Sequence, residues 1–139
     1  MNNATIFPTL SYDDATAAID FLVKAFGFER HAVYSGDEGV IHHAELRLGN
    51  GLVMLGSAGP DASATRGGGG GIYVVLGDVD SHAERARAAG AEITRDVHET
   101  DYGSREYGAR DPEGNMWHFG TYQPLDFDHA AEQEKRATA

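Results

Sequence analysis

The sequence predicts an α+β fold built from two copies of a β-α-β-β-β unit. Three observations predict it: both halves repeat one order of hydrophobic patterns, a Gly-Asn pair precedes the last strand pattern of each half, and five glycines, residues 67–71, separate the halves. We expect one domain with a polar tail. Its limits are 1–123 for the domain, about 4–57 and 70–123 for the modules, 58–71 for the glycine-rich linker and 124–139 for the tail.

The first module is predicted to begin with a strand over residues 5–12, followed by a helix. Asp13 or Asp14 can cap this helix, because either carboxylate can accept a hydrogen bond from the first turn. Apolar residues then recur at helical spacing as far as Phe26, and Gly27 is placed to end the helix. Three strands are expected next, at 29–35, 40–48 and 52–55.

The second module repeats this order. A β-rich run covers residues 72–76, and Asp80 or Ser81 is expected to cap a helix that continues to Ala89 and ends at Gly90. The remaining strands are expected at 91–98, 105–111 and 116–122.

Composition and charge exclude several classes of protein. The chain carries 22 acidic and 11 basic side chains, a net charge of −11, whereas a nucleic-acid binder normally has a basic face. No apolar run approaches the roughly 20 residues of a membrane helix, and no signal peptide is recognisable, so we expect no membrane partner and a cytoplasmic location. The absence of cysteine excludes disulfides, thiolate zinc sites and a cysteine nucleophile.

Three segments carry a resemblance to a known family: DDATAAIDFLVKAFGFE (13–29), HHAELRLGNGLVMLG (42–56) and RDPEGNMWHFGTY (110–122). With the duplication, they resemble the vicinal oxygen chelate superfamily, and most of all its glyoxalase/bleomycin-resistance-like branch, including the PhnB-like members. The resemblance covers residues 5 to about 123. It implies two βαβββ modules that form a glyoxalase-like half-barrel pair, with a cavity between concave faces, and a homodimer.

The resemblance also implies where a metal would be held in metal-dependent relatives: one ligand each on the first, fourth, fifth and eighth strands. These positions correspond to Phe7, Met54, Gly71 and His118. Phenylalanine and glycine cannot coordinate, and a methionine thioether prefers soft ions. We therefore expect no metal and no cofactor. The alternative is a divalent ion held by displaced ligands, namely His43, Glu45 and His118.

The turns predict which side chains line the cavity. If Asn50-Gly51 is a two-residue turn, Arg47 pairs with Met54 on one face. If residues 112–115 form a four-residue loop, Ala109 pairs with His118. Because paired residues share a face, and side chains alternate along a strand, these registers select a set of ligand-binding candidates. The set is His43, Glu45, Arg47, Met54, Tyr73, Arg105, Tyr107, Met116 and His118. Phe7 is added to these candidates as the first-strand position that the resemblance implies.

Three functions are consistent with these residues. The leading hypothesis is a metal-independent protein that binds a small organic ligand, such as a resistance or sequestration factor. The alternative is a metal-dependent lyase, isomerase or dioxygenase with non-standard ligands. A third is an enzyme that uses His118 as an acid or base without metal, since the imidazole pKa lies near neutrality. His118 can equally serve as a pocket contact or pack against a neighbour.

Overall fold

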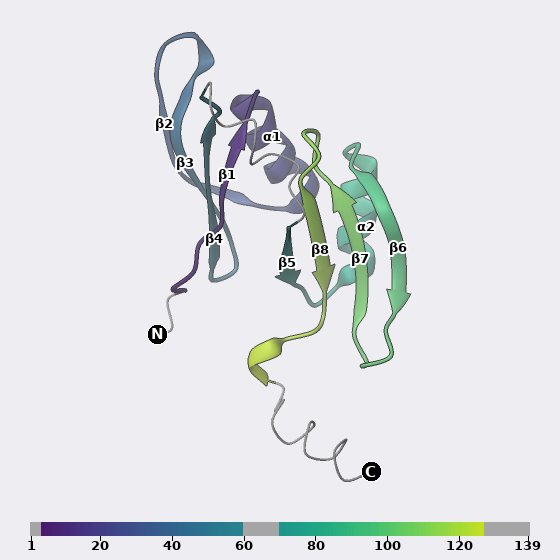
Figure 1. Ribbon diagram of the computed structural model, residues 1–139. Coiled ribbons are helices and arrows are strands. Elements are labelled where there is room, and N and C mark those ends of the chain that lie inside the picture. Colours follow the sequence, from purple (N-terminus) through teal and green to yellow (C-terminus); the bar gives the residue numbers. More distant parts are fainter. Residues whose placement is uncertain (1–3, 60–69, 127–139) are drawn as a thin grey trace.

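The computed structural model describes residues 4–59 and 70–126 (Figure 1). The first module contains β1 (Thr9–Tyr12), α1 (Ala15–Phe26), β2 (Glu29–Ser35), the 3-10 turn η1 (Asp37–Gly39), β3 (Ile41–Leu48) and β4 (Gly51–Ser57). The second contains β5 (Gly71–Val75), α2 (Val79–Ala88), β6 (Glu92–Glu99), β7 (Arg105–Arg110), β8 (Met116–Gly120) and then η3 (Pro124–Asp126). The predicted α+β fold with two βαβββ modules is confirmed. Most of the predicted linker and tail lies outside the described residues.

Each module forms its own four-stranded sheet, and the two sheets have equivalent topology. The orders are β1-β4-β3-β2 and β5-β8-β7-β6. The first strand of each module runs parallel to the last, with Thr9 beside Met54 in one sheet and Tyr73 beside His118 in the other. The internal duplication read from the sequence is therefore present in the strand pairing.

Helix α1 follows the sequence prediction closely. The Asp14 side chain accepts a hydrogen bond from the Ala17 amide at 3.0 Å, and Gly27 ends the helix in the left-handed region with φ of 85°. The buried residues of this helix are Ala15, Ala18, Ile19, Leu22, Ala25 and Phe26. One face of α1 is thus committed to the core.

The predicted start of the second helix is wrong. Asp78, not Asp80 or Ser81, caps α2, because its carboxylate accepts hydrogen bonds from both the amide and the hydroxyl of Ser81. These hydrogen bonds also lower the pKa of Asp78. Asp80 therefore lies within the first turn of α2, free to use its side chain elsewhere.

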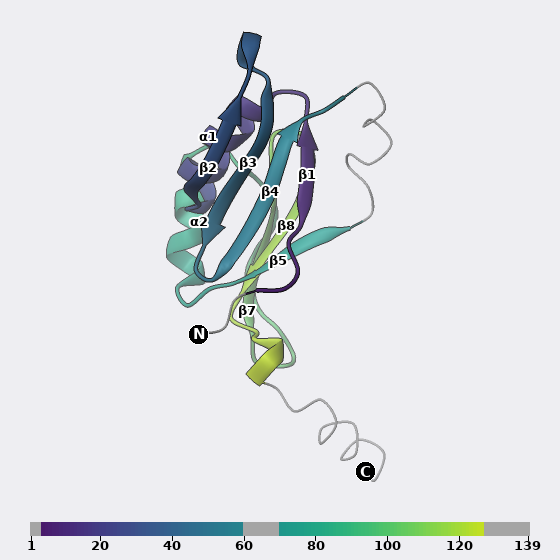
Figure 2. The same ribbon diagram turned by 90° about the vertical axis from the view of Figure 1, so that its left-hand side faces the viewer.

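Both sheets pack their apolar faces on one shared core, which includes the two helices. Phe26 of α1 contacts Trp117 and Phe119 of the second sheet, with ring centroids 5.4 and 4.9 Å apart. Helices α1 and α2 also contact each other, and Figure 2 shows both on the same side of the first sheet. The opposite face of each sheet is therefore turned away from the helices. We call it the open face.

A turn in the second module joins the two modules. Asp111 is buried, and its carboxylate accepts hydrogen bonds from the Tyr12 hydroxyl at 2.6 Å and the Trp117 indole nitrogen at 3.1 Å. Burial raises the pKa of Tyr12, and the nearby Asp111 carboxylate raises it further. Two residues further along, the Glu113 carboxylate accepts hydrogen bonds from the backbone amides of Asp13 and Asp14, which precede α1. The turn thus anchors β1 and the beginning of α1.

His82 forms a second link between the modules. Its Nε2 lies 2.7 Å from the Phe26 carbonyl oxygen, and its Nδ1 lies 2.7 Å from the Tyr107 hydroxyl. A carbonyl can only accept, so Nε2 carries the proton and Nδ1 accepts from the tyrosine. Burial lowers the pKa of His82. The folded protein therefore favours the neutral imidazole.

We expect this lowered pKa to make the protein less stable in mild acid. The contribution of neutral His82 is complete above the ordinary imidazole pKa of about 6.5, and it is lost as pH falls below that value, since the unfolded chain takes up the proton first. Urea unfolding at pH 8 and pH 5 should show a smaller loss of stability in His82→Gln than in the unmodified protein. His118→Gln, which removes an exposed imidazole, is the control. Equal pH dependence in His82→Gln and the unmodified protein would contradict the assignment.

Candidate functional site

The first hairpin has a turn one residue earlier than predicted, yet its faces are as expected. Leu48 pairs with Gly51, so the turn residues are Gly49 and Asn50, and Gly49 adopts a φ of 62° that suits glycine. Every pair is displaced by two residues from the prediction, which leaves the alternation unchanged. Glu45 pairs with Met54, and His43 and Arg47 share that open face.

The predicted register of the second hairpin is wrong by one residue. Arg110 pairs with Met116 and Gly108 with His118, so the loop has five residues, Asp111 to Asn115, rather than four. The physical reason is Asp111, whose amide donates to the Asn115 carbonyl and whose side chain accepts the Asn115 amide. These bonds hold Asp111 inside the turn.

This one-residue shift moves Arg105 and Tyr107 to the opposite face of β7, which contacts the helices. Tyr107 is buried, its ring stacks on Phe119 at 5.0 Å, and burial raises its pKa. Arg105 makes two hydrogen bonds of 2.8 Å to the Asp80 carboxylate of α2, and this pairing raises the pKa of Arg105 and lowers that of Asp80. Contrary to the prediction, the register places neither side chain on the open face, although Tyr107 still borders the pocket of this sheet from below.

The other candidates of the second sheet are placed as predicted. Tyr73, Met116 and His118 lie on the open face, with Tyr73 directly beside His118. Phe7 differs, because β1 begins only at Thr9 and Phe7 precedes it as a partly exposed residue outside the sheet. Pro8 separates it from the strand and has no amide hydrogen for a sheet hydrogen bond.

The open face of the second sheet contains a pocket of about 280 Å³. Its lining comes from β6, β7 and β8: Thr94, Arg95, His98, Glu106, Tyr107, Gly108, Met116 and His118. Gly108 lets Thr94 and Met116 pack closely over the strand, since a Cβ there would lie 2.9 Å from the Thr94 hydroxyl and 3.0 Å from the Met116 methyl. The floor of the pocket is therefore formed by a hydroxyl and a methionine that cover a buried glycine.

Glu106 is the most strongly hydrogen-bonded side chain of this pocket. Its Oε2 accepts hydrogen bonds from the hydroxyls of Tyr73 at 2.8 Å, Tyr102 at 3.0 Å and Ser104 at 3.0 Å. Burial alone would raise the pKa of Glu106, but these hydrogen bonds outweigh it, and the net pKa is lowered. The carboxylate is thus held in its ionised form.

Sequence reasoning missed Arg95, His98, Glu106 and Gly108. All four residues can be identified once the register of β7 is known. Gly108 and Glu106 then lie on the open face, and on the neighbouring strand β6 they pair with Arg95 and His98. The signal that could have identified them is the turn length: a five-residue loop starting at Asp111 selects Glu106 in place of Arg105.

The first sheet has a separate polar cluster on its open face. His43 Nε2 lies 2.9 Å from one Glu45 oxygen, and His31 Nε2 lies 3.8 Å from the other. Tyr34 stacks on His43 with ring centroids 6.2 Å apart, while Arg47 pairs with Glu29 at 3.1 Å. His43 and Glu45 thus form the expected pair, and β2 adds His31 and Tyr34.

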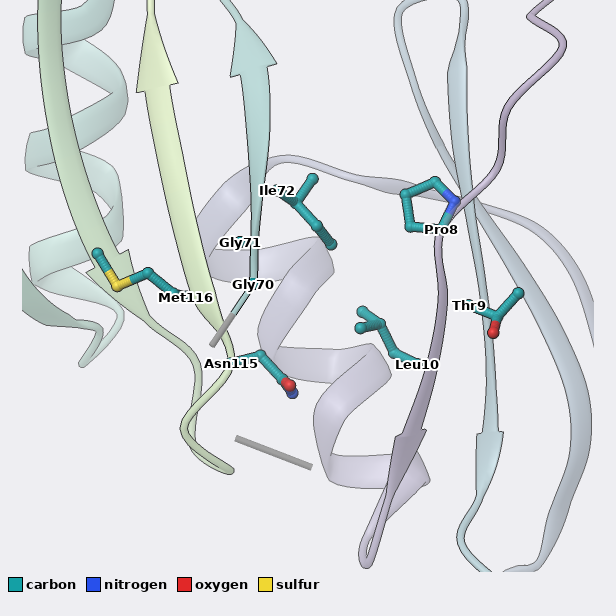
Figure 3. Close-up of a pocket in the computed structure, with 8 residues that line it drawn as sticks. All are labelled: Pro8, Thr9, Leu10, Gly70, Gly71, Ile72, Asn115 and Met116. Carbon is teal, nitrogen blue, oxygen red and sulfur yellow. The ribbon is translucent and has the colours of Figure 1, made fainter. Parts of the chain in front are cut away.

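A second hollow lies where the two modules meet. It has a volume of about 250 Å³ and is lined by Pro8, Thr9, Leu10, Gly70, Gly71, Ile72, Asn115 and Met116 (Figure 3). Pro8, Thr9 and Leu10 come from the first module, and the others come from the beginnings of β5 and β8. Among the residues that the structure describes, no acidic or basic side chain lines this hollow, so none of them supplies a charged group that could pair with a ligand.

The residues present do not fit the metal site that the resemblance implies. Positions 71 and 118 do adjoin, since a Cβ on Gly71 would lie 3.0 Å from His118 Nε2. However, Gly71 and Phe7 have no donor atom, and the Met54 thioether is soft. Within residues 4–59 and 70–126, no three His, Asp or Glu side chains are placed to hold one ion, so His43 and Glu45 are not joined by His118.

The fold is that of a protein with two βαβββ modules, and comparison with known proteins gives its family. The model of the Glyoxalase/Bleomycin resistance protein/Dioxygenase superfamily matches residues 6–119. The chain belongs to this superfamily. No helix in the described part of the chain is long and apolar enough to cross a membrane.

Individual relatives agree with this assignment. An uncharacterized protein of Mycobacterium tuberculosis is 36% identical over 126 residues, which cover 85% of this chain and 73% of the relative. The crystal structure of TioX from Micromonospora sp. ML1 is 35% identical with a TM-score of 0.69, covering 84% of this chain and 94% of TioX. The fosfomycin resistance protein FosX of Listeria monocytogenes shares the fold at 17% identity and a TM-score of 0.68, covering 89% and 94%.

Proposed function

We propose that this protein binds a small organic ligand on the open face of its second sheet, without a metal ion. The observation that carries this proposal is the pocket of about 280 Å³ over Gly108, lined by side chains of both charges. Such a mixture of a few polar groups and apolar contacts is typical of small-molecule sites. Membership of a superfamily that includes bleomycin resistance proteins supports a sequestration or resistance role.

The proposal of metal-free binding rests on donor chemistry. Divalent ions used in hydrolytic or chelate chemistry need several nitrogen or oxygen ligands. Of the four positions expected for such a site, His118 alone supplies one. Metal analysis of protein purified without chelator should show no stoichiometric divalent ion, and one bound ion per chain would contradict the proposal.

We also propose that a second copy of the chain covers the open faces. Both are turned away from the shared helix layer, and Tyr34 and Tyr73 on them are 60% and 38% exposed. Large exposed apolar side chains gathered on a face are a feature of interaction surfaces. In a sizing experiment the protein should therefore elute at twice 14.9 kDa. Elution as a single chain would restrict the ligand site to one copy.

A glycine substitution tests the pocket itself. A thermal-shift screen of small organic molecules on EDTA-treated protein first identifies a stabilising compound. Gly108→Ala should then weaken binding of that compound at least about tenfold, because the added methyl group enters the floor between Thr94 and Met116. Gly77→Ala is the matched control, since a Cβ at Gly77 meets no atom within 4 Å. Equal affinity in the two variants would exclude this pocket as the site.

A further inference from the structure

Two oppositely charged side chains line the same pocket, Arg95 on β6 and Glu106 on β7. Through strand pairing, Arg95 lies beside Gly108, and Glu106 lies two residues away on the same strand. Glu106 and Gly108 are two residues apart on β7, which corresponds to about 7 Å. The two charged side chains therefore border one pocket at different positions along β7.

Within residues 4–59 and 70–126, the Glu106 carboxylate has no lysine or arginine partner. It accepts hydrogen bonds from three neutral hydroxyls. Room for this arrangement comes from Gly120 on the neighbouring strand, where a Cβ would collide with the Tyr73 hydroxyl and with Glu106. His98 lies opposite Glu106 and favours its ionised form. The site therefore holds an oriented negative charge.

Arg95 is the complementary case. Arg87 of α2 is paired with Asp96, and Arg110 of β7 is paired with Glu92. By contrast, within residues 4–59 and 70–126 Arg95 has no hydrogen bond or ion pair with a carboxylate. This is notable in a chain with 22 acidic residues. An arginine that remains unpaired in a pocket retains its forked donors for a planar anion such as a carboxylate.

We propose that the pocket recognises a small zwitterion: a molecule with a positively charged nitrogen and a carboxylate, as in an amino acid. The ligand nitrogen faces Glu106, its carboxylate faces Arg95, and its carbon chain lies against Met116. Tyr73, whose hydroxyl is bonded to Glu106, borders the nitrogen end. This inference names the ligand class of the proposed function and rests on it.

Titration calorimetry with four defined probes tests the proposal. Glycine and 4-aminobutanoate carry both charges at two separations, while propylamine and butanoate each carry one. At least one zwitterion should bind about tenfold or more tightly than either singly charged probe, as expected when a charge-assisted hydrogen bond is added at each end. Arg95→Gln and Glu106→Gln should each weaken the zwitterion about tenfold, whereas the exposed controls Arg87→Gln and Glu92→Gln should leave it unchanged.

The outcomes separate this inference from the proposed function. If propylamine or butanoate binds as tightly as both zwitterions, or if no zwitterion binds, the inference is overturned. The proposed function still stands in either case if the compound from the thermal-shift screen loses affinity in Gly108→Ala but not in Gly77→Ala. If that compound also fails this comparison, the pocket itself is not the site. Circular dichroism of each variant confirms that an affinity change does not reflect unfolding.

Discussion

Replacing Asp111 with alanine should lower the free energy of unfolding by about 3–5 kcal/mol. The carboxylate is 5% exposed and accepts hydrogen bonds from Tyr12, Trp117 and the amides of Glu113 and Asn115. Each hydrogen bond to a charged group contributes about 1.5–3 kcal/mol, and the buried donors left without a partner add to the loss. The effect approaches the upper range for a single substitution because one side chain serves both modules.

Chemical denaturation followed by tryptophan fluorescence measures this effect, since Trp117 reports on the same turn. Asp111→Asn retains one carbonyl acceptor and should cost less than alanine. Asp101→Ala, in an exposed turn, should change stability by no more than about 0.5 kcal/mol. A loss in Asp111→Ala as small as that of Asp101→Ala would show that the turn does not hold the modules together.

Replacing Trp117 with alanine should lower the free energy of unfolding by about 3–5 kcal/mol, as is typical for a large aromatic side chain in a core. Trp117 is completely buried and contacts Phe26 and Phe28 from the first module, with ring centroids 5.4 and 5.6 Å away. The substitution leaves a cavity where the modules meet and also removes a donor from Asp111.

The neighbouring residue provides a sharp control. His118 lies next to Trp117 on β8 but points to the open face, where it is exposed. His118→Ala should therefore change stability by no more than about 0.5 kcal/mol, and urea unfolding compares the two variants directly. Similar losses in both variants would contradict the assigned faces of β8.

The sequence predicted the fold well because its signals were local and repeated. The helical stripe ending at Phe26 and Gly27 required only spacing and a glycine that tolerates positive φ. The first hairpin was assigned the correct faces even though its turn was misplaced, since a displacement of two residues preserves alternation. Trp117 and Phe119 alternate with His118 along β8 and lie in the core.

The candidate site was predicted less well, because it depended on a single residue of loop length. Asp111 was counted as the last residue of a strand, but its backbone and carboxylate hydrogen bonds place it in the turn. Side chains alternate between the two faces of a strand. The error of one residue in loop length therefore assigned Arg105 and Tyr107 to the open face, where Glu106 and Gly108 lie instead.

By itself the sequence determined two βαβββ modules, the apolar stripe of α1 and the absence of donor atoms at Phe7 and Gly71. Only the tertiary structure decided which β7 residues line the pocket and how the modules are joined. Asp111 accepts hydrogen bonds from Trp117 and from Tyr12, and Tyr12 lies 99 residues away in the sequence. No local sequence pattern can predict a contact between residues so far apart. The hydrogen bonds between Asp111 and Asn115 keep Asp111 inside the turn, and the resulting register places Glu106 rather than Arg105 at the pocket.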